Sequence, residues 1–155
     1  MALLLSTDLK NYAINQGFVK AMSGTVGTGG SAILNIFSGP QAVSADTGTN
    51  ATNNVLLCRI IAMGWSGGGT NSTTGATAGT AILANTTGYG GTALTSGIAA
   101  WARMETFGTG VTGSAGTFRI DGDVGTSGTS TFVINSTTIT VGGMVTILAC
   151  PISLG

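Results

Sequence analysis

The residues that most resemble a catalytic motif are Gly64, Ser66 and Gly68, which match the G-x-S-x-G pattern around the nucleophile of serine hydrolases. In that motif a strand precedes the serine, a helix follows it, and a base accepts the serine proton. The apolar run 55–65 can supply the strand, but glycine and polar residues follow Ser66, and the sequence has no histidine. We therefore expect Ser66 to be a loop residue and the protein not to be an enzyme.

A second match is the G-x-G-x-x-G of residues 108–113, which directly follows a predicted strand. A dinucleotide site needs a helix after these glycines, because the helix N-terminus holds the pyrophosphate. Ser114, Ala115 and Gly116 come next and lead into another strand. With 27 glycines in the chain, chance matches are expected. No cofactor is predicted.

The third candidate is a metal site at Asp121 and Asp123, which resembles the opening of a calcium loop. An EF-hand needs a bidentate glutamate at its twelfth position, where this chain has Phe132. A turn between strands is the favoured interpretation, and a cation held by the two aspartates and loop carbonyls is the alternative. Cys58 and Cys150 lie in apolar runs and are expected to be buried free thiols, because the alternative, a disulfide, would need an oxidising compartment and no secretory signal is expected. Two cysteines without a histidine cannot form a zinc site.

Charge is scarce in this chain. Only 6% of residues are charged, five basic and five acidic, against about 25% in a typical domain. This composition argues against binding to nucleic acid or to a membrane surface, and no stretch approaches the roughly 18 apolar residues of a membrane helix. The first five residues are too short for the apolar core of a secretory signal, so no such signal is expected and the protein is expected to be made in the cytoplasm. With 43% hydrophobic residues, the chain suits a homo-oligomer or a bound subunit.

Residues 1–22 differ from the rest and predict an N-terminal arm with one short helix. Ser6 or Thr7 can cap this helix, Asp8 lies in its first turn, and Gly17 is a natural end. Residues 23–155 form the predicted globular domain.

Apolar or alternating runs in that domain predict strands at 32–37, 55–65, 81–84, 98–107, 117–121, 130–134, 137–141 and 144–152. The run 55–65 is apolar on both faces and predicts a central strand. The run 98–107 alternates, with Ile98, Ala100, Ala102 and Met104 on one face and Trp101, Arg103 and Glu105 on the other. In 117–121, Phe118 and Ile120 are expected to point inward. The pairs 135–136 and 142–143 are expected to form two-residue hairpin turns.

Together these strands predict a mainly β protein, an antiparallel β-sandwich or jelly-roll-like domain with one short N-terminal helix. Within it, Arg103, Glu105, Arg119 and Asp121 are spaced for cross-strand ion pairs. The alternative is that Arg103 and Trp101 contact a neighbouring subunit, since both residue types are frequent at interfaces.

Four stretches of the sequence carry a further signal: LSTDLKNYAINQGFVKAM, LNIFSGPQAVSADTGT, SGIAAWARM and FRIDGDVGTSGTSTFVINSTTITVGGMVTILACPIS. They resemble a recurring type of tailed-bacteriophage virion protein encoded among head and structural genes. They cover about half of the chain in matching order, and they contain no catalytic signature. The glycine-rich stretch 64–80 departs from the pattern because it is longer than the family would have.

The resemblance implies a virion structural protein with a β-sandwich-like fold and no enzymatic activity. Of such roles, a small head decoration (cement) protein on the capsid surface fits best, with the major capsid protein as partner and a homotrimer as the expected assembly. The arm 1–22 and the loops 64–80 and 108–116 are the expected contacts. The residues predicted at the interface are Leu3, Leu5, Leu9, Phe18, Trp65, Trp101 and Arg103.

Two other functions remain open at this point. A receptor- or glycan-binding module of a fibre or tail would use exposed aromatic rings, for which Trp65, Tyr89 and Trp101 are the candidates. A tail-tube or connector subunit would form rings on its own.

Overall fold

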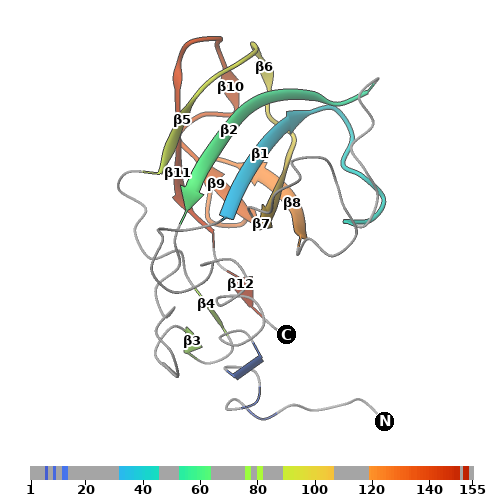
Figure 1. Ribbon diagram of the computed structural model, residues 1–155, viewed down its shortest axis with the longest axis vertical. Coiled ribbons are helices and arrows are strands. Elements are labelled where there is room, and N and C mark those ends of the chain that lie inside the picture. The colour runs from blue at the N-terminus through green and yellow to red at the C-terminus, as the bar shows by residue number, and fades with distance from the viewer. Residues whose placement is uncertain are drawn as a thin grey trace.

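The protein is built mainly of β-strands, as its computed structural model shows (Figure 1). The structure describes residues 32–45, 53–63, 89–106 and 119–150, together with residues 6, 9, 12, 13, 76, 77, 80, 81, 152 and 153. Its strands are β1 (Ala32–Ser38), β2 (Val55–Met63), β3 (Ala76–Thr77), β4 (Thr80–Ala81), β5 (Gly90–Thr92), β6 (Gly97–Ile98), β7 (Trp101–Thr106), β8 (Arg119–Gly125), β9 (Phe132–Ile134), β10 (Thr138–Ile139), β11 (Met144–Ala149) and β12 (Ile152–Ser153).

One large sheet dominates the fold, with the strand order β2-β1-β7-β8-β9-β11-β5. Neighbouring strands are antiparallel except β8 and β9, which run parallel. The two ends of the sheet meet where Cys58 bridges Ala93, and the Leu94 amide donates to the Leu57 carbonyl oxygen at 2.7 Å. The sheet therefore nearly closes into a barrel, and the predicted mainly β, sandwich-like class is confirmed. Strands β10 and β6 form a separate pair, and β12, β4 and β3 form a third sheet.

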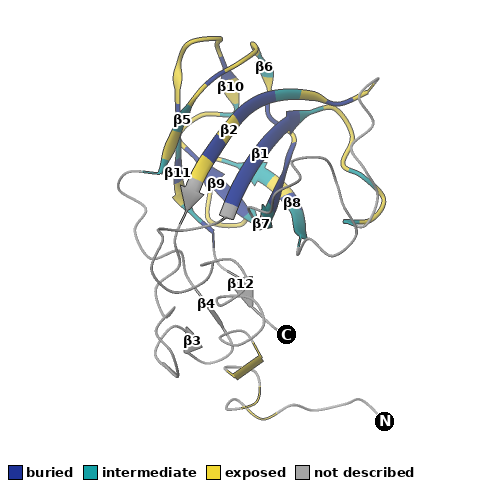
Figure 2. Cartoon of the chain, in the orientation of Figure 1, coloured by how far each residue is buried: buried dark blue, intermediate teal, exposed yellow. Residues whose placement is uncertain are grey.

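The interior of the barrel is filled by apolar side chains, which Figure 2 shows as the buried stretches of the central strands. The core residues are Leu34, Ile36, Leu57, Cys58, Ile60, Ala93, Ala99, Ala102, Met104, Phe132, Ile134, Ile139, Val145, Ile147 and Cys150. They come from every strand of the large sheet except β5 and β8, from β10, and from the connections between strands. Burial of this apolar surface is the main term that stabilises the barrel.

Strand β2 is not the doubly covered strand that its apolar run predicts. Val55 and Ile61 are 46% and 59% exposed, and Arg59 is exposed as well. Its inner face gains an extra residue from a bulge, because Ile36 pairs with Cys58 while Phe37 pairs with Leu56. Leu57 and Cys58 are therefore both fully buried although they are adjacent in sequence. Strand β1 is buried on both faces, from Ile33 to Phe37, as are residues 101–104 of β7 and all of β9.

The predicted strand 98–107 is divided in two. Ala102 and Met104 of β7 lie on one face as expected, and both are buried in the core. Ile98 lies in β6 and is 69% exposed, so the predicted single face running from Ile98 to Met104 is wrong. Between these strands the backbone leaves the ladder. The Ala99 amide donates to Thr137 O at 2.8 Å, and the Ala100 amide donates to Phe37 O at 2.9 Å.

The two hairpins predicted near the C-terminus do not form, because β10 does not pair with its neighbours in sequence. Strand β9 pairs with β11, and β10 pairs with β6. The side chain of Asn135 extends the β9–β11 ladder, since its Oδ1 accepts from the Thr146 amide at 3.0 Å and its Nδ2 donates to Met144 O at 3.1 Å. Gly142 does form a turn, at φ 79°, but the turn joins strands that do not pair with each other.

The segment 121–125 is strand rather than the predicted turn. It belongs to β8, and the turn follows at 126–131 before β9 pairs in parallel with Val124 and Gly125. Ile120 of β8 is half-buried against the core, as expected, and Phe118 lies outside the described residues. The Asp123 carboxylate closes the turn by accepting bonds from the Thr131 amide at 3.0 Å and the Thr131 hydroxyl at 2.7 Å.

The described part of the N-terminal arm is helical at Leu9, Tyr12 and Ala13. The Leu9 amide donates to Ser6 Oγ at 3.3 Å, so Ser6 is the capping residue of the two that were candidates. The predicted helix end at Gly17 and the boundary at residue 22 lie outside the described residues. Of the predicted strand 81–84, only Ala81 is described, as part of β4.

Candidate functional site

The charged residues of the described chain gather on the outer face of four adjacent strands. The sequence carries no charge between Arg59 and Arg103, and none after Asp123. The charged residues that the structure describes are Arg59, Arg103, Glu105, Arg119, Asp121 and Asp123, from β2, β7 and β8. Strand β1 lies between β2 and β7 and contributes Asn35 to the same face.

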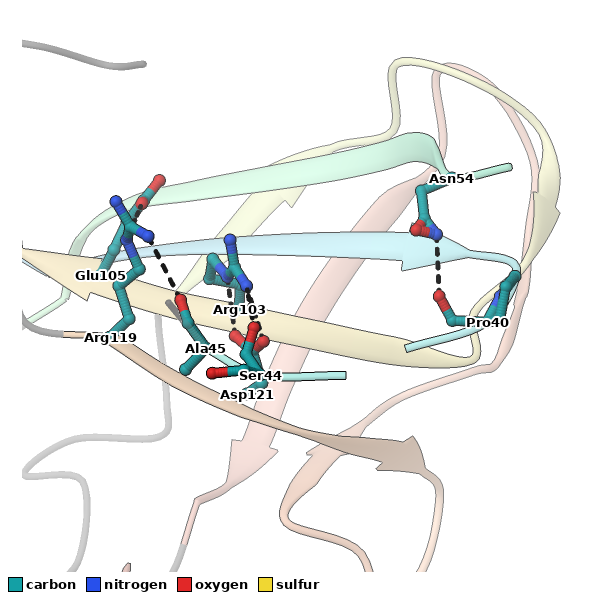
Figure 3. Close-up of polar contacts among 8 residues, drawn as sticks. All are labelled: Pro40, Ser44, Ala45, Asn54, Arg103, Glu105, Arg119 and Asp121. Atoms are coloured by element: carbon teal, nitrogen blue, oxygen red, sulfur yellow. Dashed lines mark hydrogen bonds and ion pairs between the residues drawn. The ribbon is translucent and has the colours of Figure 1, made fainter. Parts of the chain in front are cut away.

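The strand register aligns four of these side chains in one row across the sheet. Asn35 pairs with Arg59 on one side and with Arg103 on the other, and Arg103 pairs with Asp121. Arg103 donates to Asp121 through Nε and Nη2, both at 2.7 Å, and each of the two side chains is 5% exposed (Figure 3). This bidentate bond raises the pKa of Arg103. The predicted cross-strand pair is confirmed.

A second row extends this arrangement. Asn35 Nδ2 donates to Glu105 Oε1 at 2.8 Å, and Arg59 Nε donates to Asn35 Oδ1 at 2.8 Å. Arg119 Nε lies 3.9 Å from Glu105 Oε2, so the second predicted ion pair also forms. We call these six residues the polar network: Asn35, Arg59, Arg103, Glu105, Arg119 and Asp121.

The polar network holds a segment of backbone over the sheet. This segment, residues 39–45, follows β1, and we call it the strap. Arg119 Nη1 donates to Ala45 O at 3.2 Å, and Arg103 Nη2 lies 3.5 Å from Ser44 O (Figure 3). At the other end of the strap, Asn54 Nδ2 donates to Pro40 O at 2.8 Å. Gly39 begins the strap at φ 85°, where a Cβ atom would clash with Asn53 O.

Trp101 lies in the same outer face and is 1% exposed. Its ring stacks on Phe37, with centroids 4.7 Å apart, and the Arg103 guanidinium carbon lies 5.7 Å from the centroid of the indole. Within the described chain, the indole Nε1 has no hydrogen-bond partner. An unpaired buried donor of this kind costs about 1–3 kcal/mol.

The predicted interface residues are thus only partly placed. Trp101 and Arg103 are buried inside the chain and contact residues of the chain itself, so neither has surface available to a neighbour in this conformation. Leu9 is 50% exposed, next to Tyr12 at 62%. Leu3, Leu5, Phe18 and Trp65 lie outside the described residues, as do Ser66 and the 108–113 motif.

Asp121 and Asp123 do not converge on a cation site. Both Asp121 oxygens accept bonds from Arg103, and Asp123 accepts from Thr131, whose amide and hydroxyl lower the pKa of the Asp123 carboxyl. Among the described residues there is no group of three or more His, Cys, Asp or Glu side chains that could hold a metal.

Cys58 and Cys150 are buried free thiols, as predicted. Burial raises the pKa of both, that of Cys150 to about 12. A thiol with such a pKa is protonated at neutral pH and is a poor nucleophile.

A second region has the opposite character, and the sequence patterns did not predict it. Segment 92–98 lies against segment 138–144. The Ala93 amide donates to Gly143 O at 2.8 Å, and the Gly142 amide donates to Ala93 O at 2.9 Å. The Val141 amide donates to Ser96 Oγ at 2.9 Å. We call these two segments the uncharged end, since neither contains a charged residue. In Figure 1 they lie at the top of the barrel, around β5, β6 and β10.

Four large apolar side chains of the uncharged end are exposed. They are Leu94 at 57%, Ile98 at 69%, Val141 at 58% and Met144 at 64%. The polar side chains of the two segments are those of serine and threonine only. An exposed apolar patch with a polar rim is typical of protein–protein contacts, and interface cores are depleted in charge. The long uncharged run between Arg59 and Arg103 is the sequence signal that could have found it.

Comparison with known proteins adds no family assignment: no protein-family model, curated protein or solved structure matches this chain. In the described residues, no helix has the length and apolar character needed to cross a membrane. Function is therefore inferred from the polar network with its strap, from the uncharged end, and from the sequence resemblance.

Proposed function

We propose that this protein is a structural subunit of a phage virion, one that decorates the capsid and stabilises it by bridging major capsid subunits. The observation that carries the proposal is the uncharged end, where two hydrogen-bonded segments without a charged residue expose four large apolar side chains. Such a surface is stabilised when another protein covers it. The resemblance of four sequence stretches to virion proteins favours a phage particle as the assembly.

The rest of the described chain supports an assembly role over a catalytic one. The polar groups that could do chemistry are bonded to one another: Arg103 to Asp121, Asn35 to Glu105 and Asp123 to Thr131. The buried thiols of Cys58 and Cys150 have raised pKa values. These groups hold the barrel together.

The N-terminal arm is the proposed contact with the capsid. Its described apolar side chains, Leu9 and Tyr12, are both at least half exposed. They are available to pack into a neighbouring capsid subunit, as an apolar anchor in a pocket does.

Deletion of residues 1–22 tests this function. The truncated barrel should stay folded and lose binding to capsid shells in a co-sedimentation assay. A second variant, Leu9→Ser with Tyr12→Ser, keeps the full chain and should also weaken binding. Normal occupancy of shells by the truncated protein would rule out the arm as the anchor, and failure of the full-length protein to bind shells would overturn the decoration function itself.

A glycan-binding role has less support. Of its candidate aromatic residues, Trp101 is 1% exposed and Tyr89 is half-buried against the core, while Trp65 lies outside the described residues. A stacking platform for a sugar ring needs an exposed aromatic face. Binding to a glycan array would favour this role over decoration.

A further inference from the structure

Trp101 carries a buried donor that the described chain does not satisfy. The residue is 1% exposed, and its indole Nε1 has no hydrogen-bond partner among the described residues. Phe37 stacks on the indole ring, which fixes its orientation. A buried donor without an acceptor has lost its bond to water and gained nothing in return. Any motion of the chain that lets water reach Nε1 therefore recovers part of that loss.

The strap crosses the outer face of the sheet between two anchored ends. Its first part is held beside β2, where Asn54 Nδ2 donates to Pro40 O at 2.8 Å. Its last residue is held beside β8, where Arg119 Nη1 donates to Ala45 O at 3.2 Å (Figure 3). Because the strands lie in the order β2-β1-β7-β8, the strap has to pass over β1 and β7 between these two points.

The crossing lies at the level of Trp101. Phe37 and Trp101 face each other where β1 ends and β7 begins, and the strap leaves the sheet two residues after Phe37. Arg103 connects the two layers: its guanidinium carbon lies 5.7 Å from the centroid of the indole, and its Nη2 lies 3.5 Å from Ser44 O. The indole is therefore separated from the strap by the guanidinium of one arginine.

The strap is attached by its backbone and gains little from the packing of its side chains. Its anchors are side chains of other segments that reach its carbonyl oxygens, and the contact from Arg103, at 3.5 Å, is longer than the usual range of about 2.7–3.2 Å. Most of its own residues are exposed to solvent, namely Gly39, Pro40, Gln41, Val43 and Ser44. Segments with few buried apolar contacts open at a lower free energy than the core strands of the same protein.

The junction between β1 and the strap is a glycine in the left-handed region. Gly39 has φ 85°, and a Cβ atom at this position would clash with Asn53 O. The closed position of the strap therefore requires a glycine here, and this residue is the point about which the strap can turn.

We propose that the strap is a latch over Trp101, which opens as one unit about Gly39 while the barrel stays folded. Opening breaks the bonds from other segments to the strap carbonyls and lets water reach the indole Nε1. Arg103 keeps its bidentate bond to Asp121, and no strand pair is lost, because the strap lies outside the ladders of the sheet. The latch thus controls whether Trp101 and Arg103 can be reached from outside, whatever the protein binds.

Hydrogen exchange of the full-length chain, followed by NMR, tests the latch in the wild type. The signals are the indole N–H of Trp101 and the amides of residues 41–45, with the Ile36 amide in β1 as the reference for global unfolding. Trp65→Phe assigns the indole signal, since the chain has two tryptophans. The indole and strap signals should be protected about tenfold less than the Ile36 amide, with little dependence on dilute urea. A Trp101 indole as strongly protected as Ile36 would overturn the proposal.

A pair of glycine variants tests whether the strap and the indole open together. Gly39→Ala strains the closed strap. Gly142→Ala is the matched control, because this glycine also has a positive φ, 79°, but lies in the uncharged end, where a Cβ atom meets nothing within 4 Å. Gly39→Ala should lower the protection of the indole and of amides 41–45 together, by about fivefold or more. Gly142→Ala should leave both unchanged.

Thermal melting checks that each variant is folded, and the wild-type measurement stands without them. If Gly39→Ala accelerated exchange in the strap but not at the Trp101 indole, the strap would not be the cover of Trp101. Equal acceleration in Gly142→Ala would show a general loosening and would also contradict the latch. Capsid shells are absent from every arm, so these outcomes leave the decoration function to its own test.

Discussion

The outer face of β2, β1, β7 and β8, over which the strap lies, is called here the strap-covered face. It and the uncharged end belong to the same barrel, yet they differ in which side chains they bury and which they expose. On the strap-covered face, Arg103 and Asp121 are 5% exposed and bonded to each other, while Trp101 and Phe37 stack beside them. At the uncharged end, Leu94, Ile98, Val141 and Met144 are more than half exposed, and no charge is present. One face buries charge and the other exposes apolar surface.

The two regions therefore contribute differently to the stability of the single chain. Interactions inside the strap-covered face contribute to the stability and shape of the single chain. The exposed apolar side chains of the uncharged end contribute less there, because each keeps more than half of its surface in water after folding. The comparison therefore predicts large stability effects on one side and small ones on the other, with the interior of the barrel shared by both.

The largest effect is expected from Asp121→Ala. It leaves the Arg103 guanidinium buried without its carboxylate, which should lower the free energy of unfolding by about 3–5 kcal/mol. Urea denaturation measures the loss. Asp123→Ala is the control, since this exposed carboxylate bonds only to the turn and its removal should cost about 1 kcal/mol. Equal losses in the two variants would show that burial of the ion pair does not distinguish the strap-covered face.

The second prediction concerns the buried thiol of Cys150, which belongs to the barrel core. The folded-state pKa of Cys150 is raised to about 12, above the ordinary value of 9.0, so folding favours the protonated thiol. The stability that this contributes is complete below pH 9 and is lost as the pH rises from 9 toward 12. Denaturation curves across this range should show a falling free energy of unfolding, with a smaller slope in Cys150→Ala. An unchanged slope would mean that Cys150 is accessible to water in the folded protein.

A smaller effect is expected from Asn54→Ala, which removes the bond to the Pro40 carbonyl at one end of the strap. The loss of one buried hydrogen bond should lower the free energy of unfolding by about 1 kcal/mol. Hydrogen exchange of the amides in residues 41–45 should become faster. Asn135→Ala makes a matched control, because its side chain bonds the β9–β11 ladder and not the strap. Faster exchange in both variants would indicate general loosening rather than release of the strap.

Local pattern predicts much of the strap-covered face. The strand at 32–37, the shared face of Ala102 and Met104, and the pairing of Arg103 with Asp121 all follow from short-range spacing, and each is confirmed. The cap at Ser6 and the buried state of both cysteines follow in the same way.

The uncharged end could not be predicted, because it depends on contacts between distant segments. Strand β10 pairs with β6 instead of forming a hairpin, and Cys58 meets Ala93 to bring the ends of the sheet together. Neither pairing leaves a signal in the periodicity of one strand. The strap was missed for a related reason: its anchors Arg103 and Arg119 reach backbone carbonyls, which are the same for every residue type and leave no trace in sequence.

The smallest effect should come from the uncharged end itself. Ile98→Thr keeps a β-branched residue in β6 while it removes apolar surface that is already 69% exposed, so the free energy of unfolding should change by no more than about 0.5 kcal/mol. Ile36→Thr in the barrel interior is the opposite case: it introduces a hydroxyl at a fully buried site and should cost several-fold more. Urea denaturation of both variants, below the concentration at which chains associate, makes the comparison. If Ile98→Thr cost as much as Ile36→Thr, Ile98 would be supporting the monomer fold, and the uncharged end would no longer be a surface free to receive a partner.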